Sequence, residues 1–191
     1  MYPLPIPGST SFDVVVPAPD RGAQWWAGAP SAVQNPDGSF AIAYRARHGS
    51  GEHDEVILAR SDDGVNVETV ATIDKRRHGA AMTERPALLR LADGRWRLYA
   101  SFATPDSLHW WVGLIEADSL AGLAVNPHTI IFPGNDAVGV KDPVVRFDGK
   151  HWHAWVCQHL LDIPGEEDRM ETAWSTSDDG LTWSEPIPVL R

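Results

Sequence analysis

Three acidic side chains lie where two carboxyl groups could carry out acid–base chemistry together. Glu84 and Asp142 each stand within two residues of a proline that opens a short apolar run, and Glu171 stands at the start of the expected third strand of its unit. One carboxyl group that keeps its proton and one that stays ionised are the minimum set for ordinary hydrolysis of a glycosidic bond. We therefore take Glu84, Asp142 and Glu171 as the candidate catalytic residues.

Basic and aromatic side chains accompany these acids and could bind a polar ring. Planar donors form directed hydrogen bonds, and an indole offers a face on which a ring can stack. The candidate substrate-binding residues are Arg45, Arg47, His48, Arg85, Trp110, Lys141 and His159.

Structural interpretations of the same residues stay open. Asp142 could only bond the backbone at a strand start, and Glu84 with Arg85 could form an ion pair. No tight spacing of His, Cys or acidic residues predicts a metal site, so we expect no cofactor, with a structural cation left open. Cys157 follows the apolar Val156 and is expected to be buried and inert.

The chain repeats three times, and the repeat predicts the elements that position these groups. Each unit has a proline, an apolar run, an Asp-Gly pair and an aromatic-rich alternating segment, and Pro30, Pro86 and Pro143 are 56 and 57 residues apart. Alternation with a period of two predicts strands, and Asp-Gly between strands predicts a hairpin turn. With two further strands, each unit has the four antiparallel strands of a β-propeller blade.

We therefore expect an all-β chain, a single β-propeller domain over residues 1–191, with three four-stranded antiparallel blades. A sandwich is the alternative fold, and no helix of useful length is evident. An open blade edge invites aggregation, so the three blades should be part of a five-bladed propeller or half of a six-bladed homodimer. A strand-like run at Phe12–Val16 could pair with another blade. The blades are expected at about 25–75, 82–133 and 138–191, closing with strands at Glu68–Ile73, Thr129–Phe132 and Ile187–Leu190.

Two short motifs resemble those of known enzyme families. The segment Lys141-Asp142-Pro143-Val-Val resembles the Asp-Pro motif of the five-bladed furanosidases, which include arabinanases, xylosidases and invertases. This resemblance implies that an Asp at the start of an innermost strand is the base or nucleophile, that a second Asp stabilises the transition state or tunes the acid, and that a Glu is the general acid. The first-blade position that should carry the base is Ala29. The segment Thr83–Pro86 resembles a region of the mannoside phosphorylases, with Arg85 where that pattern has Asp.

A third motif, Thr176–Trp183, resembles the Asp-box of sialidases and related propellers, and residues 61–67 are a degenerate copy. In such a hairpin Asp178 is expected to accept backbone N–H groups, Gly180 to supply a positive φ, and Trp183 to pack between sheets. The motif is structural, and it does not imply sialidase activity.

The composition excludes several kinds of partner. A net charge of -10 argues against nucleic acid, and no apolar run reaches the roughly 20 residues that cross a bilayer. A single cysteine and an N-terminus without signal-peptide features predict a cytoplasmic protein.

The expected function is that of a glycoside hydrolase-like protein that acts on a small saccharide or glycoside at the top mouth of the propeller. A glycan-binding propeller without catalysis is the first alternative, favoured by Ala29. A glycoside phosphorylase, with Arg45, Arg47, Arg85 or Lys141 holding phosphate, is the second. Whether the chain is an enzyme therefore stays open, with hydrolysis favoured.

Overall fold

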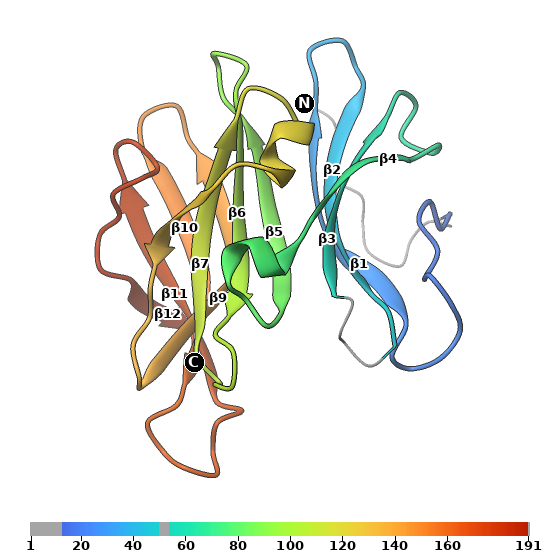
Figure 1. Ribbon diagram of the computed structural model, residues 1–191. Coiled ribbons are helices and arrows are strands. Elements are labelled where there is room, and N and C mark those ends of the chain that lie inside the picture. Colours follow the sequence, from blue (N-terminus) through green and yellow to red (C-terminus); the bar gives the residue numbers. More distant parts are fainter. Residues whose placement is uncertain (1–12, 50–53, 191) are drawn as a thin grey trace.

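The computed structural model describes residues 13–49 and 54–190, which form three antiparallel sheets and two short 3-10 helices (Figure 1). The all-β prediction is confirmed. None of the helices within these residues is long and apolar enough to span a membrane. The strands are β1 (Trp26–Gln34), β2 (Phe40–Arg47), β3 (Glu55–Ser61), β4 (Glu68–Ile73), β5 (Thr83–Arg90), β6 (Trp96–Ala103), β7 (Trp110–Ala117), β8 (His128–Phe132), β9 (Val138–Phe147), β10 (Trp152–Leu160), β11 (Met170–Ser177) and β12 (Ile187–Leu190), and the helices are η1 (Lys75–His78) and η2 (Ala121–Ala124).

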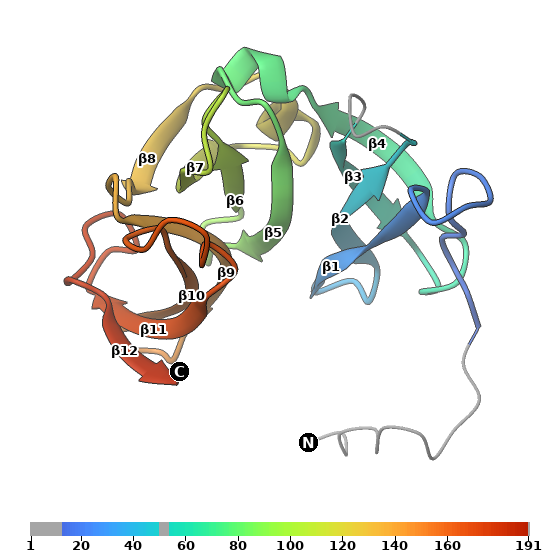
Figure 2. The ribbon, with the colours of Figure 1, turned by 90° about the horizontal axis from the view of Figure 1, so that it is seen from below.

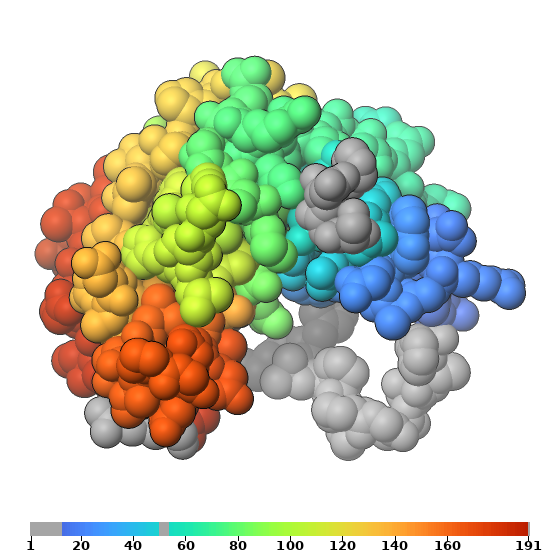
Figure 3. All heavy atoms as spheres, turned by 60° about the horizontal axis from the view of Figure 1, so that its bottom comes forward, coloured from blue at the N-terminus to red at the C-terminus, as the bar shows by residue number. Residues whose placement is uncertain are grey.

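Each sheet contains four consecutive strands in chain order, so each is one blade. Figure 2 shows the blades side by side in an arc, with the first strands β1, β5 and β9 on the inside and the last strands on the outside. Strand β5 contacts both β1 and β9. The order of the blades follows the chain from the blue to the red end in Figure 3. The inner strands therefore bring three sequence repeats to one central region.

The hydrophobic core lies in the two junctions between blades. Leu58 and Phe102 belong to the cluster between the first and second blades, and Tyr99 and Val156 belong to the cluster between the second and third. Successive strand residues point to opposite faces, and the middle blade is covered on both. Every residue of its second strand, β6, is accordingly buried.

One expected strand is absent. Residues 13–16 of the predicted strand Phe12–Val16 form coil and a bend, and Phe12 lies outside the described residues. Pro17 and Pro19 follow directly, and a proline has no N–H to donate to a strand ladder. The prediction was therefore wrong for residues 13–16. These residues lie instead beside the first blade, where Val14, Val15 and Val16 line a pocket with residues of β1 and β2.

The hairpin turn after β11 differs from its prediction in one residue. The carboxylate of Asp179, not Asp178, accepts two turn N–H groups at 2.7 and 2.8 Å, and the Ser177 hydroxyl accepts the Gly180 N–H at 2.9 Å. Asp179 stands two residues after Ser177, which places its carboxylate inside the turn. Asp178 is exposed and lies 3.0 Å from His151. The turn after β3 has the same arrangement, with Asp63 in the place of Asp179.

The other two predictions for this turn are confirmed. Gly180 has a φ of 72°, which a residue with a side chain rarely adopts. Trp183 packs against Tyr99 and Phe132 of the second blade. The Tyr99 hydroxyl donates a hydrogen bond to the Gly180 carbonyl oxygen at 2.7 Å, so this turn fastens the third blade to the second.

Candidate functional site

The first strand of each blade bulges beside its proline. The pairing registers of β1, β5 and β9 shift at Ala29, Arg85 and Asp142. The φ angles of Ala29 and Asp142 are 48° and 54°, in the left-handed region that residues other than glycine rarely adopt. Asp tolerates this conformation better than Ala does. Strained backbone of this kind persists where the surroundings hold it, and it gathers at functional sites.

A chain of ion pairs crosses the three blades beside these bulges. The Glu84 carboxylate lies 3.3 Å from Nη1 of Arg45 and 3.0 Å from Nζ of Lys141. Nη2 of Arg45 also lies 2.8 Å from the buried carboxylate of Asp54. Arg45 belongs to the first blade, Glu84 to the second and Lys141 to the third. Because all four side chains are largely withdrawn from water, solvent screens their charges poorly.

Asp142 lies next to this network. Its backbone N–H donates to the Ser101 hydroxyl at 2.8 Å. Burial raises the pKa of the Asp142 carboxyl, and the nearby charge of Glu84 raises it further, against the opposing effect of Lys141. A carboxyl group with a raised pKa keeps its proton at higher pH and can deliver it to a leaving group. Asp142 therefore has the character of a proton donor, and the neighbouring Glu84 carboxylate is held between two cations.

Two tryptophan rings contact the cations of the network. The Lys141 ammonium lies 5.3 Å from the ring centre of Trp110, and the Arg45 guanidinium lies 4.9 Å from that of Trp26. Cations are attracted to the face of an indole ring. Trp110 is buried against Lys141, and its stacking on a substrate stays a prediction.

The remaining binding candidates lie around the same end of the blades. Arg47 Nε lies 3.8 Å from Asp54 Oδ1, and neither atom has a hydrogen-bond partner within the described residues. A ligand or water oxygen that bonds both atoms fits this separation. Arg85 is exposed, and its charge acts on the pKa of Asp142. His48 lies 4.0 Å from the exposed carboxylate of Glu55.

The last two candidates, His159 and Glu171, lie on the second and third strands of the third blade. Nε2 of His159 contacts the backbone carbonyl of Glu167. Glu171 pairs across the sheet with Gln158, whereas Lys141 pairs with the next residue, Cys157. The pairing of β9 with β10 shifts its register between Trp155 and Cys157, beside Lys141. Strand alternation therefore does not relate the faces of Glu171 and Lys141 across this bulge. The structure thus brings Glu84, Asp142, Lys141 and Arg45 together, and the role of Glu171 stays a prediction.

Asp54 and Ser101 belong to the site, although the sequence did not single them out. Ser101 stands at the sixth position of β6, and Arg45 and Cys157 stand at the sixth positions of β2 and β10. Alignment of the repeats could have identified this position. Asp54 directly precedes β3, and nothing local distinguishes it from the other loop acids of the first blade.

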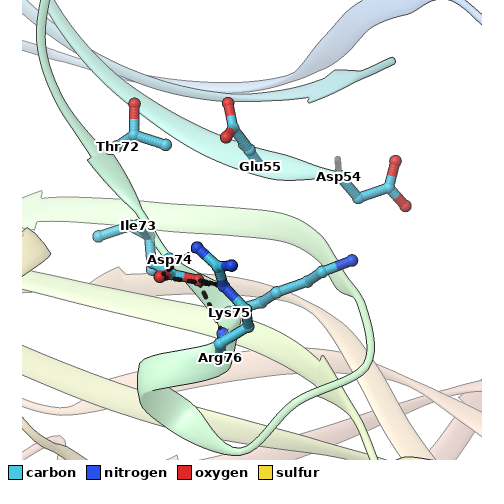
Figure 4. A pocket seen from close by; sticks show the side chains of 7 residues that line it. All are labelled: Asp54, Glu55, Thr72, Ile73, Asp74, Lys75 and Arg76. Atoms are coloured by element: carbon cyan, nitrogen blue, oxygen red, sulfur yellow. Dashed lines mark hydrogen bonds and ion pairs between the residues drawn. The ribbon is translucent and has the colours of Figure 1, made fainter. Parts of the chain in front are cut away.

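A pocket of about 350 Å³ adjoins the network on the first blade (Figure 4). Asp54 and Glu55 come from the start of β3, and the segment 74–76 comes from the end of β4 and the start of η1. Arg76 is turned towards Asp74, with Nε 2.9 Å from its carboxylate. Asp54 is the one lining residue that also contacts Arg45. In residues 13–49 and 54–190, no three His, Cys, Asp or Glu side chains gather as a metal-binding group.

Comparison with known proteins shows a likeness of fold. No protein-family model matches the chain, and no curated protein matches its sequence. A thermostable family-43 glycoside hydrolase matches 92% of this chain and 56% of its own, with a TM-score of 0.67 and 14% identity. The alpha-L-arabinofuranosidase from Lactobacillus brevis matches 85% of this chain and 53% of its own, with a TM-score of 0.60 and 15% identity.

A third solved structure is the Penicillium chrysogenum alpha-L-arabinanase complexed with arabinobiose. It matches 85% of this chain and 49% of its own, with a TM-score of 0.59 and 13% identity. The chain thus spans about half the length of these solved structures. The fold is of the propeller type found in glycoside hydrolases, and at these identities the likeness extends to the fold alone.

Proposed function

We propose that this chain acts as a glycoside hydrolase-like protein on a small saccharide or glycoside, bound where the inner strands meet. The observation that carries the proposal is the pairing of two unlike carboxyl groups. Glu84 is held between Arg45 and Lys141, and the neighbouring Asp142 has a raised pKa. Two carboxyl groups whose surroundings favour different protonation states are the arrangement that glycoside hydrolysis needs.

In this proposal Asp142 donates a proton to the leaving oxygen, and Glu84 stabilises the positive charge that develops on the sugar or activates water. Lys141 and Arg45 orient Glu84, and the exposed Arg85 binds substrate hydroxyl groups. Glu171 stays a prediction for a third carboxylate. Fold-level likeness gives weaker support, and it makes arabinobiose and arabinofuranosides the first substrates to test. The Asp-box and mannoside phosphorylase resemblances remain predictions.

One observation favours the alternative of a glycan-binding protein without catalysis. The first-blade bulge has the same left-handed backbone as the bulge at Asp142, but its residue is Ala29. A methyl group cannot act as a base or nucleophile. If hydrolysis needs a carboxylate there, the remaining side chains only hold a ligand.

The test compares turnover in single amide variants. The purified chain is assayed with arabinobiose and a panel of aryl glycosides, with and without inorganic phosphate. We expect Asp142→Asn and Glu84→Gln to lower turnover by roughly 100-fold or more, the usual contribution of a positioned acid or base. The control is Asp62→Asn, an exposed acid at the opposite end of the first blade, which should keep full activity.

Circular dichroism of each variant confirms that loss of activity is not loss of folding. Full turnover in both Asp142→Asn and Glu84→Gln would exclude the proposed roles. Saturable sugar binding without product would favour the binding protein. Turnover that requires phosphate would identify a phosphorylase.

A further inference from the structure

Ser101 is a fully buried polar residue on β6, at 0% exposure. Its neighbours Ala100 and Phe102 belong to the cluster between the first and second blades. Successive strand residues point to opposite faces, so Ser101 faces the third blade. There its hydroxyl oxygen accepts the backbone N–H of Asp142 at 2.8 Å. A buried hydroxyl group costs stability unless it is hydrogen-bonded, and the bond to Asp142 satisfies the Ser101 hydroxyl.

The bond lies where the backbone of Asp142 departs from the regular strand. Asp142 has no partner in the register of β9 with β10, and its φ of 54° is left-handed. The extra residue of a bulge is left unpaired by the strand ladder. Backbone that residues with a side chain rarely adopt persists where its surroundings hold it. The Ser101 hydroxyl is therefore a contact that holds Asp142 in this conformation.

Ser101 is also the cross-strand partner of Glu84. The two residues lie opposite each other in the pairing of β5 with β6. Ser101 thus connects the backbones that carry the two candidate carboxyl groups, because it pairs with Glu84 within the second blade and bonds Asp142 in the third. The Glu84 carboxylate spans the same junction, 3.0 Å from Nζ of Lys141. The placement of Glu84 relative to Asp142 consequently depends on Ser101.

The junction of the first and second blades has a similar contact. Arg45 and Ser101 stand at the sixth positions of β2 and β6. Arg45 lies 3.3 Å from the Glu84 carboxylate, on the first strand of the following blade. Ser101 likewise bonds Asp142 on the first strand of the blade that follows its own. In both junctions this position of the second strand contacts an acidic residue at the bulge of the next blade.

We propose that Ser101 is a positioning residue, which holds the backbone of Asp142 and thereby fixes where its carboxyl group lies relative to Glu84. The role rests on the proposed function, in which Asp142 donates a proton. The Ser101 hydroxyl acts through Asp142 and takes no part in the reaction itself. Without this hydroxyl the bulge loses a restraint on its left-handed backbone, and the Asp142 carboxyl is free to turn towards solvent.

The pKa of the Asp142 carboxyl reports its position. Burial raises this pKa, and a carboxyl group that turns towards water loses that effect. The groups around this carboxyl are Glu84, Lys141, Arg85 and Arg45, with the Cys157 thiol opposite Lys141 in the sheet. A substitution of Ser101 changes none of them. We therefore expect that removal of the hydroxyl lowers the pKa of Asp142.

The test compares Ser101→Ala, Ser101→Cys and Ser101→Thr in the full chain. Alanine lacks the acceptor, cysteine has a similar shape but is a weak acceptor, and threonine keeps the hydroxyl. NMR spectroscopy measures the hydrogen exchange of the Asp142 N–H and the titration of the Asp142 carboxyl, which Asp142→Asn assigns. Ser101→Ala and Ser101→Cys should speed the exchange and lower the pKa, whereas Ser101→Thr should retain both wild-type values.

Kinetics with arabinobiose or an aryl glycoside supply a second readout. Ser101→Ala should lower kcat by roughly 10- to 100-fold with little change in KM, because misplacing a reacting group by about 1 Å is enough to cost about 100-fold. A proton donor acts only below its pKa, so the loss of activity at high pH should begin at a lower pH in this variant.

The matched control is Ser31→Ala. The Ser31 hydroxyl accepts the Leu88 N–H at 2.9 Å, so it joins β1 to β5 by the same kind of bond, in which Asp142 takes no part. This variant should lose similar stability. It should leave the hydrogen exchange and pKa of Asp142 unchanged, and also the kinetics.

Unchanged exchange and an unchanged pKa of Asp142 in Ser101→Ala would overturn the proposal. Equal changes in Ser31→Ala would do the same, because they would assign the effect to the loss of any bond between blades. The NMR readings do not depend on turnover. If no glycoside is cleaved, or if Asp142→Asn keeps full turnover, the proposed function fails, while the exchange and titration of Asp142 still decide whether Ser101 holds it.

Discussion

Replacing Lys141 by Met and Glu84 by Gln, singly and together, tests whether the charge network holds the blades to one another. The two charged atoms are 3.0 Å apart, and the side chains are 12% and 19% exposed. At an effective dielectric constant near 20, their attraction is roughly 5 kcal/mol before desolvation. Desolvation offsets a large part of this attraction, so we expect a coupling free energy of about 1.5–3 kcal/mol from the double-mutant cycle.

The single variant Glu84→Gln should lose more stability than the coupling itself, about 3–4 kcal/mol, because it leaves Lys141 without its carboxylate in a region of low exposure. The assay is urea unfolding followed by tryptophan fluorescence, with the free energy of unfolding extrapolated to water. The matched control is the Arg60–Glu68 pair, which has nearly the same separation, 2.9 Å, but is 64% and 69% exposed. Its coupling should be about 0.5 kcal/mol or less. Equal coupling in the two cycles would refute the argument that burial makes the Lys141–Glu84 pair strong.

Three further predictions concern stability. Burial and the neighbouring His128 lower the pKa of His78 from 6.5 to about 4. The stability that neutral His78 contributes is therefore present above pH 6.5 and is lost as the pH falls towards 4. In urea unfolding, the free energy of unfolding should fall by about 1–2 kcal/mol from pH 7 to pH 5, and the variant His78→Phe should lack this loss. Ala29→Gly should stabilise the chain by about 1 kcal/mol in the same assay, because glycine adopts a φ of 48° without strain, whereas Ala32→Gly in the same strand should destabilise it. Trp183→Ala should lower the free energy of unfolding by about 3–5 kcal/mol, because it empties the junction beside Tyr99, and a loss below 1 kcal/mol would contradict that packing.

The sequence predicted the blades because their signals are local and recur. An alternating segment and an Asp-Gly turn can be recognised within about ten residues, and three copies at a constant spacing exclude chance. Strands β4 and β12 accordingly have the predicted bounds, and β8 begins one residue before its predicted start. The segment 13–16 shows where such reasoning fails. Apolar residues there have a neighbouring sheet, but the prolines that follow prevent them from joining its ladder.

The site was less predictable, because its contacts join residues from different blades. The prolines marked Glu84 and Asp142 as candidates in the sequence. The partners of Glu84, however, are Arg45 on β2 and Lys141 on β9, and which side chains of those strands face Glu84 cannot be read from the sequence. Glu171 illustrates the difficulty. It pairs with Gln158, whereas Lys141 pairs with Cys157 beside a bulge of β9, and a bulge breaks the alternation that would relate the two side chains. Strand periodicity alone does not fix that register across four strands.

The bulge positions of the three blades carry unlike side chains. The bulge positions are Ala29, Arg85 and Asp142, on one backbone pattern. Glu84, Asp142 and Lys141 come from the second and third blades, and the first blade adds Arg45 with its partner Asp54. In the proposed function the chemistry therefore belongs to the junction of the second and third blades, and the first blade orients Glu84 through Arg45.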